Sequence, residues 1–401
     1  MRTKYWLGMG MFATLAMAQD GNFNGSISCS VQPVAAATKV VEETKGVEEA
    51  RVVEKKPVVQ IALLLDTSNS MDGLIEQAKS QLWKIVNEFI NAKQNGKRPD
   101  LEVALFEYGK SSLVASEGFI RMIVPLTNDL DKISEELFAL KTNGGDEYCG
   151  WVIREAVNRL TWSKAPDDFK AIFIAGNEPF TQGPVQYQQS CKAAVEKGII
   201  VNTIHCGSEH DGVSGKWRDG ALVADGKYML IDQNRAVVHY EAPQDKEIAR
   251  LGVELNKTYI AFGSAGQANL HRQSAQDANA LSLASQGASV QRALNKSSAL
   301  YCNGSWDLVD ACKEKTVDLS KIKKEELPTE MQKMDANERK TYVETKTKER
   351  EKLQNDINRL NAERAKYVNE QMKKNPQANT LDQVMVTAIR EQATKRNYRF
   401  E

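Results

Sequence analysis

The stretch Asp-Thr-Ser-Asn-Ser, residues 66–70, follows directly after an apolar run at residues 58–65, and this junction decides the fold. The apolar run is typical of a buried strand, and side chains of extended backbone point alternately to opposite sides. Asp66, Ser68 and Ser70 are therefore expected to converge at the end of that strand. One carboxylate with two hydroxyls suits Mg²⁺ or Mn²⁺ and leaves positions for water or an outside ligand. The alternative interpretation is a helix N-cap, a role that Asp and Ser often fill.

Short apolar runs alternate with helical patterns between Val58 and about Gly263. The pattern predicts six strands, at Val58–Leu65, Leu101–Tyr108, Phe119–Ile123, Ala171–Ala175, Ile199–Cys206 and Tyr228–Ile231. Apolar residues at helical spacing predict helices over 74–89, 153–160, 185–197 and 246–256. This alternation predicts an α/β fold, a doubly wound and mostly parallel, Rossmann-like sheet covered on both faces. Ligands of such sheets bind outside the carboxyl ends of the strands, which is where Asp66 falls.

Over residues 58–263 the sequence resembles the von Willebrand factor type A (vWA) domain, of the bacterial exported type. Three loops carry the resemblance: residues 66–70, residues 142–147 (Thr-Asn-Gly-Gly-Asp-Glu) and residues 172–179 (Ile-Phe-Ile-Ala-Gly-Asn-Glu-Pro). The resemblance implies a metal-ion-dependent adhesion site. In the family, Asp and Ser of the first loop, Thr of the second and Asp of the third hold a metal directly or through water. The open metal position takes a carboxylate from a partner.

Two of the three loops depart from the family pattern. The second has Gly-Gly-Asp, ending at Asp146, where the family often has Gly-Gly-Thr, although Thr142 nearby offers a hydroxyl. The third has Gly176 where aligned members carry Asp. We therefore expect a variant metal site with rearranged ligands. The predicted metal ligands are Asp66, Ser68, Ser70, Thr142 and Asp146, with Mg²⁺ or Mn²⁺ as the cofactor. The competing interpretation is a degenerate, metal-free domain.

The rest of the chain divides into four segments. Residues 1–18 have a charged start, an apolar middle and a small-residue end, which predicts a secretory signal peptide, with a retained anchor as the alternative. Residues 19–57 are predicted to form a disordered linker. Residues 264–317 are predicted to be helices packing on the vWA domain. Residues 318–401 are densely charged with a thin apolar stripe, which predicts a helical hairpin or coiled coil that serves as a spacer or forms a homo-oligomer.

The predicted signal peptide implies an exported protein, periplasmic or secreted, with no membrane insertion after cleavage. Export makes disulfides feasible for the six cysteines. Cys302 with Cys312, and Cys191 with Cys206, are the pairs that the spacing allows. Six cysteines permit fifteen pairings, and the sequence does not choose among them. The alternative is a set of reduced, buried thiols.

The composition and the motifs restrict the classes of function that this chain can have. The chain has 53 basic and 53 acidic residues, which argues against a nucleic-acid partner. We expect a non-enzymatic protein-interaction module that captures an acidic side chain of a protein partner through the metal. A metal-free scaffold acting through its C-terminal helices is the second hypothesis. A metal-dependent hydrolase is the third. Asp72, Glu147 and Glu178 could serve as its base, but nothing marks any of them, and Asp72 and Glu147 are interpreted as ordinary first-turn helix acids.

Overall fold

The structure is a computed structural model that describes residues 56–374, except 236 and 238, and residues 380–400. The predicted signal peptide (1–18) and nearly all of the predicted linker (19–57) lie outside the described residues. Within them, no helix is long and apolar enough to cross a membrane.

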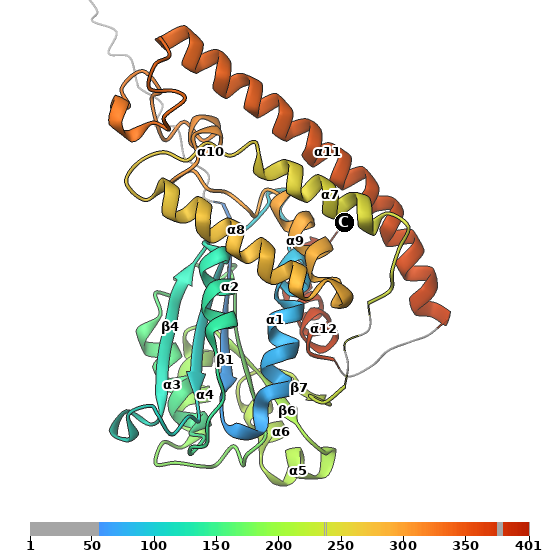
Figure 1. The fold of residues 1–401 in the computed structure, drawn as a ribbon. Coiled ribbons are helices and arrows are strands. Elements are labelled where there is room, and N and C mark those ends of the chain that lie inside the picture. Colours follow the sequence, from blue (N-terminus) through green and yellow to red (C-terminus); the bar gives the residue numbers. More distant parts are fainter. Residues whose placement is uncertain (1–55, 236, 238, 375–379, 401) are drawn as a thin grey trace, which may run out of the picture. The chain divides into compact units, whose positions relative to one another are not determined.

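A six-stranded sheet forms the centre of the fold (Figure 1). Its order is β4-β3-β1-β5-β6-β7, and only β4 is antiparallel to its neighbour. The strands are β1 (Val58–Asp66), β3 (Asp100–Tyr108), β4 (Ile120–Thr127), β5 (Phe169–Gly176), β6 (Ile200–Cys206) and β7 (Tyr228–Ile231). The predicted α/β fold with a mostly parallel, doubly wound sheet is confirmed, because helices cover both faces and the six predicted apolar runs are its strands.

Alternate residues of β1 face the two halves of the core, which explains why the whole strand is apolar. Ile61, Leu63 and Leu65 face α1 (Asp72–Asn87), α2 (Leu130–Ala139) and α12 (Leu381–Thr394). Ala62 and Leu64 face α3 (Cys149–Arg159), α4 (Tyr187–Glu196) and α6 (Trp217–Val223). The short α5 (Glu209–Ser214) follows β6. Since both faces are buried, β1 is fixed in the middle of the sheet and its last residue is held in place.

After β7 the chain leaves the sheet and builds a helical layer. Its helices are α7 (Asp245–Asn256), α8 (Gly266–Ser282), α9 (Ala288–Lys296), α10 (Leu308–Lys313) and α11 (Ala336–Lys374). The layer has apolar clusters of its own, and α9 packs on α1 while α8 packs on α2. The predicted packing of residues 264–317 on the sheet domain thus occurs through these helices. The helix at 245–256, predicted as part of the sheet domain, packs instead on α9 and α11.

The last described segment returns to the sheet domain. Leu381, Met385 and Ile389 of α12 are buried in the same apolar cluster as α1. Strand β8 (Tyr398–Phe400) pairs antiparallel with β2 (Ala92–Gln94). The prediction of a hairpin or coiled coil over 318–401 is corrected here: α11 joins the helical layer, whereas α12 covers the sheet. The apolar face of α12 is more complete than the thin stripe of α11, so it can fill a core position.

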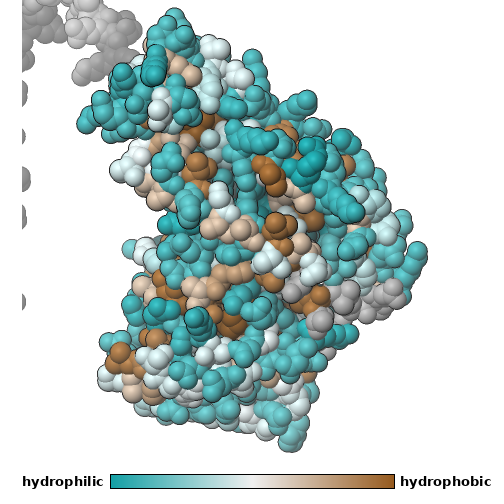
Figure 2. Space-filling view, in the orientation of Figure 1, coloured by the Kyte–Doolittle hydropathy of each residue, from teal (hydrophilic) through white to brown (hydrophobic). Residues whose placement is uncertain are grey.

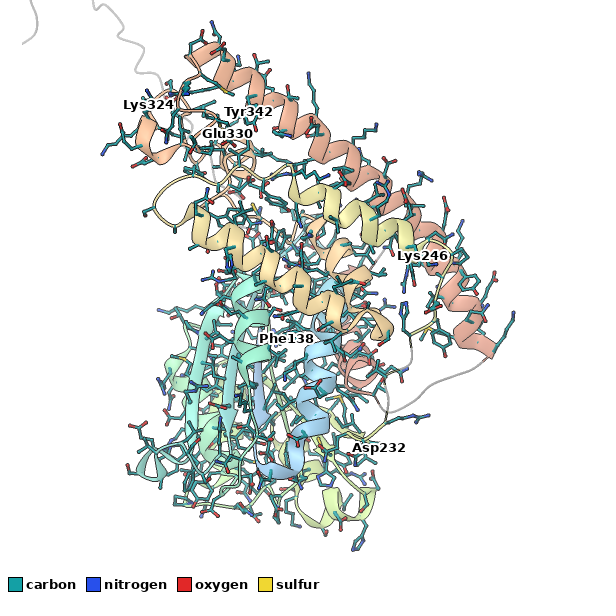
Figure 3. All side chains as sticks on the ribbon, viewed as in Figure 1. Phe138, Asp232, Lys246, Lys324, Glu330 and Tyr342 are labelled. Atoms are coloured by element: carbon teal, nitrogen blue, oxygen red, sulfur yellow. The ribbon has the colours of Figure 1, made fainter. Side chains whose placement is uncertain are left out.

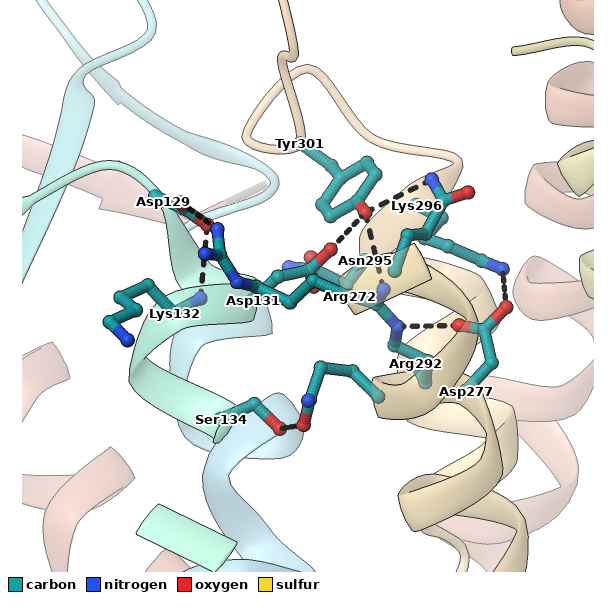
Figure 4. Close-up of polar contacts among 12 residues, drawn as sticks. Asp129, Asp131, Lys132, Ser134, Arg272, Asp277, Arg292, Asn295, Lys296 and Tyr301 are labelled. Atoms are coloured by element: carbon teal, nitrogen blue, oxygen red, sulfur yellow. Dashed lines mark hydrogen bonds and ion pairs between the residues drawn. The ribbon is translucent and has the colours of Figure 1, made fainter. Parts of the chain in front are cut away.

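Buried ion pairs join the helical layer to α2 (Figure 4). The Arg292 guanidinium of α9 contacts Asp131 of α2 at 2.5 Å and Asp277 of α8 at 2.8 Å. It also lies over the Trp83 ring of α1, 4.4 Å from the ring centroid. Lys296 pairs with the same Asp277 at 2.6 Å. These charges are compensated by close partners, as buried charges must be.

The long helix α11 packs on the other helices of the layer through every seventh residue. Val343, Arg350, Ile357 and Arg364 are its buried positions. Its outward surface is mostly hydrophilic (Figure 2), and charged side chains stand out along it (Figure 3). A seven-residue repeat is the periodicity of a coiled coil, but here the stripe packs within the chain, on α7, α9 and α10.

All five cysteines in the described part of the chain are free thiols. Cys191 and Cys206 belong to the clusters on opposite faces of the sheet, so they are not placed for the predicted pairing. Cys302 is not bonded to Cys312, and its thiol instead donates to Glu314 Oε1 at 2.7 Å. The sixth cysteine, Cys29, lies outside the described residues.

Arg350 offers a test of how α11 is held. Its guanidinium donates to Asp307, Asp310 and Thr258, and Arg350 is only 4 % exposed. We expect Arg350→Ala to lower the free energy of unfolding by about 3–5 kcal/mol, because Asp307 would stay buried without its partner. Arg359→Ala, on the exposed face of the same helix, should change it by less than about 0.5 kcal/mol. Urea denaturation measures both; equal effects would contradict this account.

Candidate functional site

The first loop lies at the carboxyl end of β1, where the sequence places it. Asp66 is fully buried, and its Oδ1 accepts a hydrogen bond from the Ser68 backbone N–H at 2.8 Å. Its Oδ2 is buried and has no hydrogen-bond partner among the described residues. The Ser68 and Ser70 hydroxyls lie 3.3 Å apart, and Ser70 donates to Asn177 Oδ1 of the third loop at 3.4 Å. Neither serine makes an N-cap hydrogen bond, so the capping interpretation does not explain them.

The second loop crosses the first, but its two predicted ligands point to other partners. The Asn143 N–H donates to the Thr67 carbonyl at 2.9 Å, which fixes the crossing. Thr142 donates through its hydroxyl to Asp72, the first residue of α1. Asp146 is exposed and accepts from the Tyr148 hydroxyl at 3.3 Å. The structure thus gathers Asp66, Ser68 and Ser70 and places Thr142 beside Asp72, while Asp146 turns toward solvent.

Glu147 is the carboxylate that enters the site from the second loop. It precedes α3, is 6 % exposed, and its N–H donates to Gln182 Oε1 at 3.1 Å. The interpretation of Glu147 as an ordinary first-turn helix acid is corrected, because α3 begins at Cys149. A Cβ on Gly109 would lie 2.7 Å from both Asp66 Oδ1 and Glu147 Cγ, so both side chains press on this glycine. The sequence assigned the ligand role to Asp146, whereas the adjacent acid, Glu147, is the one that is buried at the site.

The site is an acidic cluster without a counter-charge. Burial, followed by the neighbouring Glu147 and Glu178, raises the pKa of Asp66 to about 8, although hydrogen bonds from Ser68 act in the opposite direction. Burial and the charge of Glu178 likewise raise the pKa of Glu147 to about 7. Among the described residues, neither carboxyl forms an ion pair with a basic side chain. The raised pKa values mean that a proton or a bound cation would stabilise the cluster at neutral pH.

Tyr108 occupies the space where the resemblance would place an aspartate. A Cβ on Gly176 would lie 2.6 Å from the Tyr108 hydroxyl oxygen and 3.0 Å from Asp66 Oδ2. That hydroxyl donates to the Ala175 carbonyl at 3.0 Å, which holds the ring in place. The glycine in the third loop is thus a steric requirement of the tyrosine at the end of β3.

The residues present fit a small divalent cation held mainly by hydroxyls and water. Asp66 Oδ2 is an orphaned buried oxygen beside two hydroxyls, and hard cations favour this donor set. In the part of the chain that the structure describes, no group of three or more Asp, Glu, His or Cys side chains is arranged to bind a metal by itself. A cation here would depend on Ser68 and Ser70 as well as on a carboxylate.

No family model and no curated protein matches the sequence. Solved structures with a similar fold include a conserved hypothetical protein, BatB, from Bacteroides thetaiotaomicron, at 19 % identity and a TM-score of 0.33, covering 43 % of this chain and 90 % of that one. The SpRpn10 VWA domain has 17 % identity and a TM-score of 0.34, covering 43 % of this chain and 88 % of that one. An aerotolerance-related membrane protein from Bacteroides fragilis has 16 % identity and a TM-score of 0.31, covering 43 % and 92 %. At these identities and TM-scores the likenesses are weak.

The contact between Tyr108 and Gly176 can be tested by substitution. Gly176→Ala should destabilise the protein by about 1–3 kcal/mol, because the added methyl meets the tyrosine hydroxyl. In the Tyr108→Phe background the same change should cost less, since the hydroxyl is gone. Thermal or urea unfolding of the two single variants and the double variant gives the coupling between the two positions. Additive effects would show that this contact does not exclude a side chain at 176.

The Asp66 carboxyl predicts how stability depends on pH. Its pKa is raised from 3.8 to about 8 in the folded chain, so the folded state holds a proton that the unfolded state releases between these values. Without metal, the free energy of unfolding should therefore fall as pH rises from about 4 to about 8. Asp66→Asn should flatten this dependence and be more stable than wild type at pH 8. Glu107→Gln, at a buried acid that pairs with Arg121 at 2.6 Å, is the control and should retain the dependence.

Proposed function

We propose that this chain is an exported, non-enzymatic protein-interaction module that uses a divalent cation to capture an acidic side chain of a protein partner. The observation that carries the proposal is the buried Oδ2 of Asp66, which has no hydrogen-bond partner among the described residues, in the loop where the Ser68 and Ser70 hydroxyls meet and where Glu147 and Glu178 add negative charge. A cation placed there would satisfy the orphaned oxygen and offset the repulsion between Asp66 and Glu147.

Each residue has a distinct role in this proposal. The Ser68 and Ser70 hydroxyls would supply neutral oxygens, and Asp66 and Glu147 the negative charge, directly or through water. Mg²⁺ or Mn²⁺, when bound, would offer an exchangeable position to an outside carboxylate. Thr142 and Asp146, which were predicted as ligands, would act only if they left Asp72 and Tyr148, with which they now bond.

A binding role agrees better with this site than hydrolysis does. The carboxyls nearest Asp66 are Glu147 and Glu178, and both act on it by charge repulsion. Asp72, a further candidate base, accepts a hydrogen bond from Thr142 at the start of α1. These acids repel one another or are held by local hydrogen bonds, which supports a non-enzymatic role.

Cation binding is tested with the full chain by calorimetry with MgCl₂ and with MnCl₂. We expect one saturable site in the wild type and affinity at least tenfold weaker in Ser70→Ala, because a hydroxyl ligand is lost. Ser112→Ala is the matched control, since Ser112 is an exposed serine in the loop after β3. Unchanged Mn²⁺ affinity in both Ser70→Ala and Asp66→Asn would overturn the metal site.

The open position is tested with acetate, which stands in for a partner's carboxylate. Acetate protons should relax faster in the presence of the Mn²⁺-loaded wild type than in the presence of Mn²⁺ with Ser70→Ala. Addition of a chelator should abolish the effect. If Mn²⁺ binds but acetate relaxation equals that of the variant, the cation has no exchangeable position, and the metal is structural. The scaffold hypothesis would then be favoured, with the C-terminal helices as the contact surface.

A further inference from the structure

Positively charged side chains line an open cavity at the amino end of β5, the end of the strand remote from Asp66. The cavity has a volume of about 810 Å³. Its charged lining consists of Lys164, Lys170, Lys197 and Arg396, against a single acid, Glu196. The surplus of positive charge sets this cavity apart in a chain whose total charges balance.

Lys170 is the buried member of the group. It is 3 % exposed, and its ammonium donates to the Ser163 carbonyl at 2.9 Å and to the Lys197 carbonyl at 2.7 Å. Burial and the neighbouring Arg396 lower the pKa of Lys170, although the charge of Asp168 raises it. An ammonium has three donor hydrogens, so one remains after the two carbonyl bonds. Within the described residues no carboxylate forms an ion pair with it.

Arg396 and Lys197 are bonded in the same way, to neutral acceptors. The Arg396 guanidinium donates to the carbonyls of Pro166 at 2.6 Å and Gly198 at 3.3 Å, with a longer contact to the Asp168 carbonyl at 3.5 Å. Lys197 donates to the Val157 carbonyl at 2.8 Å. A guanidinium has five donor hydrogens, so Arg396 keeps two beyond these three bonds.

Buried cations elsewhere in the described chain are matched by acids. Arg292 and Lys296 pair with Asp277, Arg350 with Asp307, and Arg364 with Asp245. Lys170 is as deeply buried as these residues, yet it is held by carbonyls alone. A buried cation normally requires a negative partner, and at this cavity an outside anion can fill that position.

We propose that this cavity binds the phosphate group of a small phosphorylated molecule between Lys170 and Arg396. A phosphate dianion matches the surplus of positive charge and offers oxygens to the remaining donors of both side chains. Trp162, Leu160 and Val195 line the same cavity and provide apolar surface for the organic part of the ligand. Arg396 follows α12 in the chain, whereas Lys170 lies on β5, so the ligand would also bridge the sheet and the returning C-terminal segment.

The test uses the full chain without divalent metal, in chelator, and titrates inorganic phosphate and then phenyl phosphate at constant ionic strength. We expect saturable binding of phosphate, tighter binding of phenyl phosphate, and a rise in the melting temperature. Arg396→Gln should weaken binding roughly tenfold, the loss expected for one charge-assisted hydrogen bond. Lys192→Gln, at an exposed lysine of α4 outside the cavity, should bind like wild type.

Further variants keep the test decisive. Lys164→Gln and Lys197→Gln change exposed residues and should weaken binding severalfold without unfolding the chain, even if Lys170→Met does not fold. Asp66→Asn should bind phosphate normally, which separates this site from the proposed cation site. Phosphate binding that chloride at equal ionic strength displaces, or that is equal in Arg396→Gln and Lys192→Gln, would overturn the proposal and show general electrostatic attraction only.

Discussion

The burial of one carboxylate, Asp66, is the constraint on which the site depends. Asp66 is the last residue of β1, which lies between β3 on one side and β5 on the other. Glycines flank it on both sides, Gly109 after β3 and Gly176 at the end of β5, and the Tyr108 ring of β3 fills the space next to Gly176. The enclosure removes water from Asp66 and leaves one oxygen without a partner. Burial raises the free energy of the ionised carboxylate, and for the same reason a cation bound beside it would be favourable.

The helical layer lies, in sequence, between two parts of the sheet domain. The layer is inserted between β7 and α12, and α12 supplies part of the core beside α1. The Asn87 side chain at the far end of α1 donates a hydrogen bond to the Gln291 carbonyl of α9, which attaches the layer there. Since α1 begins at the site and spans 16 residues, about 24 Å separates its two ends. One rigid helix therefore joins the candidate site to the helical layer (Figure 1).

Sequence reasoning succeeded where one local rule determines the structure. The six strands were predictable because a strand buried on both faces must be apolar along its length. The convergence of Asp66, Ser68 and Ser70 followed from the alternation of extended backbone. Glu147 was not predicted as a ligand because its burial depends on where α3 begins, and helix boundaries are weakly encoded. The exclusion of a side chain at Gly176 depends on Tyr108, 68 positions earlier, and the place of α12 depends on packing that its own segment does not reveal.

The return of α12 and β8 to the sheet has a consequence for biosynthesis. Strands β1 to β7 and their first covering helices leave the ribosome long before residues 381–400 are made. Until then, the apolar surface that Leu381, Met385 and Ile389 cover stays open beside α1, and β2 lacks the strand with which it pairs. Such nascent surfaces invite aggregation. A core that is closed by α12 thus keeps its apolar surface open for longer during synthesis than a core that is complete once the strands are made.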